Sequence, residues 1–188
     1  TFEYGVADQV SPLIRRVIAR NPSAFTLHGT GTYIIGHGQV AVIDPGPDDP
    51  KHIEAILNAV KGETVSHIVI THTHRDHSPG AALLQAETDA EIWGCGPHGH
   101  GRKDKPSAAD ISEEGADTDY MPDSMANDAD TLETKSWALQ AVHTPGHTSN
   151  HTCYLLREEN ALFSGDHVMG WSTTIVSPPD GDMYRYMQ

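Results

Sequence analysis

The 188 residues suffice for one domain with a hydrophobic core, since a chain of this length buries roughly 70% of its unfolded surface. Asp and Glu outnumber Lys and Arg 26 to 12, which disfavours loose binding to nucleic acid phosphates or anionic membranes. There is no apolar run of membrane-spanning length and no signal-peptide pattern, and two cysteines are too few for a disulfide framework. We therefore expect a cytoplasmic domain of undefined oligomeric state.

The N-terminal half alternates short apolar runs with turn residues, a pattern typical of strands and connecting helices. Its predicted strands are Leu13–Ile18, Thr32–Ile35, Val40–Ile43 and His67–Thr71. Pro50 suits a first helical turn, and apolar residues follow it at helical spacing until Gly62, so an amphipathic helix is expected between them. Ser78 and Pro79 supply an N-cap and a first helical residue for a second helix, which should continue to about Gln85.

The C-terminal half begins with an acidic segment. Apolar periodicity disappears over residues 97–130, and ten acidic residues lie between Asp104 and Glu133. We interpret 97–130 as a solvated surface loop, with a substrate-facing lid as the alternative, because such a segment buries little apolar surface. The strands predicted beyond it are Trp137–Val142, Thr152–Leu156 and Ala161–Ser164, followed by a helix from Asp182. Strands followed by helical segments imply one layered αβ domain over residues 1–188.

Potential metal ligands are concentrated directly after the predicted strand His67–Thr71. His72, His74, Asp76 and His77 lie within six residues. In an extended segment His72 and His74 project to the same side, whereas Asp76 and His77 follow as the chain turns toward the helix, so two nearby metal positions are expected. Imidazole nitrogen and carboxylate oxygen suit Zn²⁺ and also admit Mn²⁺ or Fe²⁺. Zinc is the first expectation.

Two later turns offer further ligands. His147 and Asp166 each stand in a turn after a predicted strand, where functional side chains often lie. Beyond Asp166, the residues Trp171, Ser172 and Thr173 follow closely enough to line a pocket, although packing beneath the sheet is an equal alternative.

The segment His72-Thr73-His74-Arg75-Asp76-His77 matches the His-x-His-x-Asp-His signature of the metallo-β-lactamase superfamily, and His147 and Asp166 stand at its later motifs in the right order. The stretches around these motifs most resemble the lactamase-β-like-2 and glyoxalase-II-like branch. The resemblance covers nearly all of the chain and implies a four-layer αβ/βα sandwich.

The resemblance also implies a site with two zinc ions. His72, His74 and His147 would hold the first, Asp76 and His77 the second, and Asp166 both. Asp44 resembles the early aspartate of the family and would orient metal ligands from behind.

In the family, a last metal-binding histidine is expected after another strand that follows the motif of Asp166. His167 is adjacent to Asp166 and is expected to point elsewhere. The C-terminal part of the family domain is therefore expected to be absent, which would leave the second metal position incomplete.

The function implied by the resemblance is metal-dependent hydrolysis. Metal-bound hydroxide would attack an ester, thioester, amide or phosphodiester, and Asp76 would orient it and take its proton. Two alternatives stay open: an iron-dependent oxygenase of the same fold, and a truncated metal-binding domain with weak activity. The substrate would be a small molecule or RNA, without stable nucleic acid binding or membrane attachment. The motif does not identify it, because substrate selection depends on pocket loops.

Overall fold

Seven strands form the larger sheet of the computed structural model, which describes residues 2–102 and 115–188. Their spatial order equals their chain order: β1 (Asp8–Ser11), β2 (Ile14–Ile18), β3 (Gly31–Ile35), β4 (Gln39–Ile43), β5 (Thr64–Ile70), β6 (Glu91–Gly94) and β7 (Ser124–Met125). Neighbouring strands from β1 to β4 are antiparallel, and those from β4 to β7 are parallel. Parallel strands need crossover connections, and α1 (Pro50–Ala59) and α2 (Gly80–Thr88) provide the first two.

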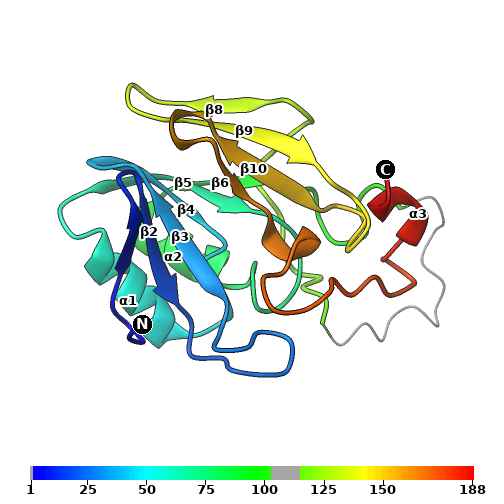
Figure 1. The fold of residues 1–188 in the computed structure, drawn as a ribbon. Helices are drawn as coiled ribbons and strands as arrows, with labels where there is room; N and C mark the ends of the chain where they lie inside the picture. Colours follow the sequence, from blue (N-terminus) through cyan, green and yellow to red (C-terminus); the bar gives the residue numbers. More distant parts are fainter. Residues whose placement is uncertain (1, 103–114) are drawn as a thin grey trace.

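The smaller sheet is an antiparallel meander that packs against the larger one (Figure 1). Its strands are β8 (Thr131–Glu133), β9 (Ala138–His143), β10 (Thr152–Leu156) and β11 (Ala161–Phe163). The short helical turns η2 (Arg157–Glu159) and η3 (Gly165–His167) follow β10 and β11, and α3 (Met183–Tyr186) lies near the C-terminus. Within residues 2–102 and 115–188, no helix covers the outer face of the smaller sheet, so helix, sheet and sheet are the layers seen.

The larger sheet is buried on both faces, and its central strands carry apolar residues at nearly every position. Val40 and Val42 of β4 belong to the core beneath α1 and α2, whereas Ala41 and Ile43 belong to the core between the sheets. This alternation follows from the period of two along a strand. The two cores hold β4, β5 and β6 rigidly, and the loops at their carboxyl ends are therefore well positioned for a site.

Two local predictions need correction. Ser78 does not cap α2: its hydroxyl donates to Oδ2 of Asp117 (2.6 Å), and Pro79 precedes the helix in helical conformation without a side-chain cap. The acidic stretch 97–130 is not solvated throughout, because β7 pairs with β6 and the side chains of Ala116, Tyr120 and Ala126 are buried. Residues 103–114 of that stretch lie outside the described residues. Strands β1, β6 and β7 were not predicted.

No helix in the described part of the chain is both long and apolar enough to cross a membrane.

Trp137 joins the two sheets, and its removal should destabilise the fold. The side chain is 1% exposed, and its indole nitrogen donates to the carbonyl of Gln39 on β4 (3.0 Å). We expect Trp137→Ala to lower the free energy of unfolding by about 3–5 kcal/mol, measured by urea denaturation, because it leaves a large cavity and an unpaired carbonyl. The control Trp171→Ala, at a side chain that is 48% exposed, should change it by about 0.5 kcal/mol or less. Equal effects of the two variants would contradict this role.

Candidate metal centre

The turn after β5 directs His72 and His74 toward one point. His72 is fully buried, and its Nε2 lies 3.1 Å from Nδ1 of His74. The Thr71 hydroxyl donates its proton to Oδ2 of Asp44 (2.7 Å). The hydroxyl oxygen of Thr71 therefore acts as the acceptor toward Nδ1–H of His72 (3.0 Å). A neutral His72 then presents the lone pair of Nε2 toward His74, which is the form in which imidazole binds a metal.

The smaller sheet brings His147 and Asp166 to the same point. His147 follows β9, and its Nε2 lies 3.0 Å from Nδ1 of His74. Asp166 lies in η3, with Oδ2 3.6 Å from Nε2 of His147 and 3.9 Å from Nε2 of His72. Nδ1–H of His147 donates to the carbonyl of Ile175 (2.5 Å), which leaves Nε2 as the lone-pair nitrogen at the centre.

These side chains fit a divalent metal ion. One ligand atom from each of four residues lies within 4.8 Å of all the others: His72, His74, His147 and Asp166. The nitrogen spacings of 3.0 and 3.1 Å are close to the roughly 3.3 Å edge of a tetrahedral site with bonds of 2.0–2.1 Å. Imidazole lone pairs and a carboxylate oxygen that converge in this way repel one another unless a cation lies between them.

The pKa directions of the histidines agree with ligand chemistry. Burial, reinforced by the neighbouring imidazoles, lowers the pKa of His72 well below its ordinary value. Burial and the imidazole of His147 lower the pKa of His74 to about 4. Both rings are therefore neutral near pH 7, and binding a cation there displaces no proton.

Asp76 and His77 form a second set of ligand atoms beside Asp166. Nε2 of His77 lies 3.2 Å from Oδ2 of Asp76 and 3.4 Å from Oδ1 of Asp166. Burial opposes protonation of His77, but the carboxylates of Asp76, Asp166 and Asp44 outweigh it and raise the pKa well above its ordinary value. The carboxylates thus attract positive charge to this point, and a metal ion is one way to supply it. Asp166 contacts both sets, as a bridging ligand would.

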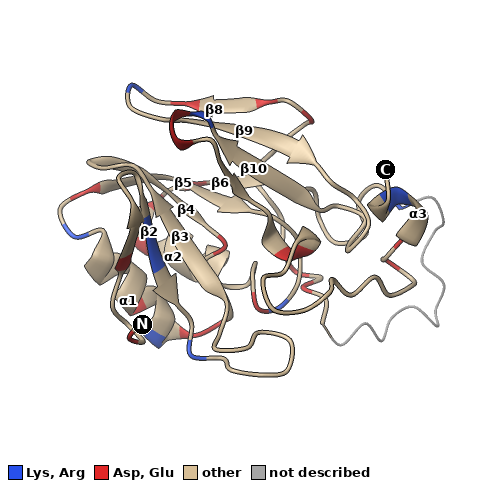
Figure 2. Cartoon of the chain, viewed as in Figure 1, with Lys and Arg blue, Asp and Glu red and all other residues tan. Residues whose placement is uncertain are grey.

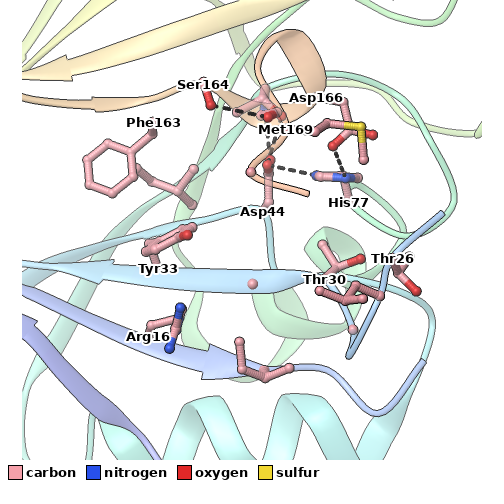
Figure 3. A pocket seen from close by; sticks show the side chains of 18 of the residues that line it. Arg16, Thr26, Thr30, Tyr33, Asp44, His77, Phe163, Ser164, Asp166 and Met169 are labelled. Atoms are coloured by element: carbon pink, nitrogen blue, oxygen red, sulfur yellow. Dashed lines mark hydrogen bonds and ion pairs between the residues drawn. The ribbon is translucent and has the colours of Figure 1, made fainter. Parts of the chain in front are cut away.

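Asp44 organises this cluster from behind (Figure 3). It is buried at the end of β4, and its carboxylate accepts hydrogen bonds from the backbone of Thr71 (2.9 Å), the hydroxyl of Thr71 (2.7 Å) and Nδ1 of His77 (2.9 Å). The bond to Nδ1 turns Nε2 of His77 toward Asp76 and Asp166. A carboxylate behind a ligand histidine fixes the orientation of the ring and strengthens it as a donor.

Two other histidines lie close by without joining the four-residue group. His151 is buried, and its ring stacks on that of His72, with centroids 5.0 Å apart. His167 directs its ring toward Tyr186, at a centroid distance of 4.8 Å, and is absent from the group found in the described residues.

A C-terminal strap, residues 174–186, holds the loops of the smaller sheet and was not predicted as part of the site. The hydroxyl of Thr174 donates to the carbonyl of Asp166 (2.8 Å), and that of Tyr186 donates to the carbonyl of His167 (2.8 Å). The buried carboxylate of Asp180 accepts from the backbone and hydroxyl of Ser149, just after His147. These partners lie 8, 19 and 31 residues apart in sequence, and no local motif indicates them.

Two cavities reach the centre. The first, about 510 Å³, is lined by aromatic and aliphatic side chains and reaches Asp44, Asp76, His77 and Asp166 (Figure 3). Trp171 lines it, whereas Ser172 and Thr173 are exposed and line neither cavity. The second, about 820 Å³, reaches His74, Asp76, His147 and Asp166.

The chain is similar to known proteins in sequence and in fold. The model of the metallo-beta-lactamase superfamily matches residues 26–188. A lactamase-like protein of Pestalotiopsis microspora is 35% identical over 172 residues, covering 90% of this chain and 48% of its own length. A protein of Aspergillus terreus (strain NIH 2624 / FGSC A1156), named atrochrysone carboxyl ACP thioesterase, is 32% identical over 172 residues, with the same coverage. The chain thus spans about half the length of these curated relatives.

Solved structures share the fold. A beta-lactamase domain protein from Burkholderia ambifaria superposes with a TM-score of 0.72 at 21% identity, covering 94% of this chain and 62% of its own. ETHE1 from Myxococcus xanthus superposes with a TM-score of 0.65 at 20% identity, covering 93% and 66%. At these identities the likeness concerns the arrangement of the chain alone.

His74 is central to the four-residue group, and His74→Ala should remove the metal bound there. Its Nδ1 is the nitrogen nearest to both His72 and His147. Bound zinc per chain, measured by mass spectrometry after dialysis, should fall by about one ion. The control His37→Ala changes an exposed histidine that bonds only to the carbonyl of Pro12 and should keep the full content. Full metal content in His74→Ala would refute this ligand assignment.

Asp44→Asn should weaken metal binding without removing a ligand. The amide keeps the shape of the side chain but loses one of its two acceptor oxygens, so Thr71 and His77 are no longer both satisfied. We expect the zinc dissociation constant, measured by competition with a chelator, to rise about 10- to 100-fold. Asp48→Asn, at an exposed carboxylate, should leave it unchanged. An affinity in Asp44→Asn equal to that of the unmodified chain would show that Asp44 does not orient the ligands.

Proposed function

This chain belongs to the metallo-β-lactamase superfamily, and on that premise we propose that it is a metal-dependent hydrolase that cleaves a thioester. The observation that carries the proposal is the convergence of three imidazoles and a carboxylate within 4.8 Å, open to a cavity of about 820 Å³. Cavities of this size accommodate small-molecule substrates.

The thioester is chosen from the ester, thioester, amide and phosphodiester substrates that such a centre would serve. Three relatives, at 34%, 32% and 33% identity, are named atrochrysone carboxyl ACP thioesterases. The chain has 26 acidic and only 12 basic residues, which disfavours RNA as the substrate because its phosphates need positive charge for binding.

His72, His74 and His147 would hold one zinc ion, Asp76 and His77 a second, and Asp166 would bridge them. When bound, these ions would supply a water of lowered pKa as nucleophile and would polarise the acyl oxygen. No Ser or Cys side chain is then needed as a nucleophile.

Asp76 is the residue that would receive the proton of the attacking water. Burial raises the pKa of its carboxyl, but His77, reinforced by a hydrogen bond from the Thr30 hydroxyl (2.7 Å), outweighs burial and holds the pKa below its usual range. The carboxylate is therefore ionised and held by Thr30, and it lines both cavities. As a general base, this ionised and oriented carboxylate would have to lie within hydrogen-bond reach of the water that the metal ions hold.

The proposal predicts metal-dependent thioesterase activity that Asp166→Ala abolishes. The zinc-loaded chain should release thiol from the benzoyl thioester of 3-mercaptopropionamide, and both chelation and Asp166→Ala should lower kcat/KM by at least about 100-fold, because both remove the group that binds the nucleophile. The exposed control Asp119→Ala should keep full activity.

Three outcomes, observed after loading the chain with zinc or with iron, separate the alternatives. Activity after loading with zinc supports the proposal, whereas oxygen consumption that occurs only after loading with iron would support the oxygenase. Stoichiometric metal binding without turnover on thioester, β-lactam or RNA substrates would leave a metal-binding domain and refute hydrolysis by this chain.

A further inference from the structure

The larger cavity at the metal centre is lined by two chemically different groups of residues. His74, Asp76, His147 and Asp166 form the reactive group. Phe25, Met169 and Ile175 contribute apolar side chains from the loops that follow β2 and η3. Phe25 and Ile175 are 66% and 47% exposed, so their apolar side chains are accessible to a ligand in the cavity.

Arg75 is the cation that lines this cavity, one residue from each of His74 and Asp76. Its backbone nitrogen donates to the carbonyl of Gly115 (2.9 Å), and its Nε donates to the carbonyl of Ala116 (3.1 Å). These two bonds fix the stem of the side chain. A guanidinium has four further N–H donors on its two terminal nitrogens, and no acid among residues 2–102 and 115–188 pairs with them.

The uncharged polar groups of the cavity are already used within their own loop. The hydroxyl of Thr26 donates to the carbonyl of Asn21 (2.6 Å), and the hydroxyls of Ser23 and Thr26 lie 2.9 Å apart. The side-chain amide of Asn21 bonds to Thr30. The side chain of Arg75 is exposed, and its terminal nitrogens are thus available to a ligand in this cavity.

The excess of acidic residues in this chain affects how an anion can be bound near Arg75. Figure 2 shows Lys and Arg at separate places along the ribbon, and Asp and Glu outnumber them in the sequence. Long-range attraction of an anion is therefore weak, and an anionic group would have to be held by a local, directional contact. A guanidinium offers this, because its two parallel N–H groups match the two oxygens of a carboxylate or phosphate.

We propose that Arg75 binds a carboxylate or phosphate on the substrate's leaving group while the acyl group lies against Phe25, Met169 and Ile175. The substrate class is therefore an apolar or aromatic acyl thioester with an anionic thiol part. This inference rests on the proposed thioester hydrolysis and adds the residue that selects the substrate. Arg75 takes no part in bond cleavage.

A purely structural role is the competing explanation. Through Ala116, Arg75 also supports the segment in which Asp117 accepts the hydroxyl of Ser78. Loss of that support would affect every substrate equally, whereas loss of an anion contact would affect only the anionic ones.

The test compares benzoyl thioesters of three thiols on the zinc-loaded chain: 3-mercaptopropionamide, 3-mercaptopropionate and 2-mercaptoethyl phosphate. The amide and the carboxylate have nearly the same shape and differ in charge. We expect kcat/KM for at least one anionic thioester to exceed that for the amide by about tenfold, mainly through KM. Whether the carboxylate or the phosphate is preferred identifies the anion.

Arg75→Met should reduce that preference to about one while changing kcat/KM for the amide by less than about twofold. Arg75→Lys, which keeps the charge but loses the paired N–H groups, should retain part of it. Lys61→Met removes an exposed charge at the far end of α1 and should leave the preference intact.

Two results would overturn the inference while leaving the proposed function standing. One is equal kcat/KM for all three thioesters; the other is an anion preference that persists in Arg75→Met, which would place the anion on the metal ions. If no thioester is hydrolysed, the proposed function fails. Calorimetry with the benzyl thioethers of the same three thiols then tests whether Arg75 binds an anion. Tighter binding of an anionic thioether that Arg75→Met abolishes supports the anion site at Arg75. Equal binding of all three thioethers refutes that site.

Discussion

The carboxylate of Asp44 holds the metal centre together, although it contributes no ligand atom to the four-residue group. It lies at the end of β4 and accepts hydrogen bonds from the backbone and the hydroxyl of Thr71, at the end of β5. It also accepts a hydrogen bond from Nδ1 of His77. Through Thr71 it also determines which nitrogen of His72 carries the proton. One buried anion thereby orients a histidine of each ligand set. The cost of burying its charge is offset because its contacts are short hydrogen bonds.

The two sheets meet at the carboxyl end of β5, and the hydrogen bonds between them explain why the metal ligands converge. The backbone nitrogen of Thr152 on β10 donates to the carbonyl of Thr71 (2.9 Å), and the buried hydroxyl of Tyr154 donates to the carbonyl of Ile70 (2.8 Å). The smaller sheet is therefore fixed against the carboxyl end of β5. His147 and Asp166, which leave that sheet in turns, reach His72 and His74 as a consequence. The geometry of the centre depends on this junction more than on either sheet alone.

The sequence predicted the features that depend on near neighbours. The short apolar run from Val40 to Ile43 indicated a strand, and the His72 to His77 segment indicated a metal centre, because each pattern is complete within a few residues. The features it missed depend on distant partners. Ser78 has a local signal for capping, but Asp117, 39 positions away, takes its hydroxyl. Nothing near Thr30 or Ile175 indicates that they contact Asp76 and His147, and β7 is too short to carry a periodic pattern.

The strap of residues 174–186 has a consequence for how the protein is made. During synthesis the larger sheet leaves the ribosome first and has its own helices to pack against. The loops with His147 and Asp166 emerge later. Their hydrogen-bond partners, the carbonyl of Ile175 and the hydroxyls of Thr174 and Tyr186, emerge later still. A nascent chain exposes the motif from His72 to His77 to cellular metal long before the rest of the pocket exists. Selection among metals by the full ligand geometry is thus a property of the finished polypeptide, and the first ion captured during translation need not be the one retained.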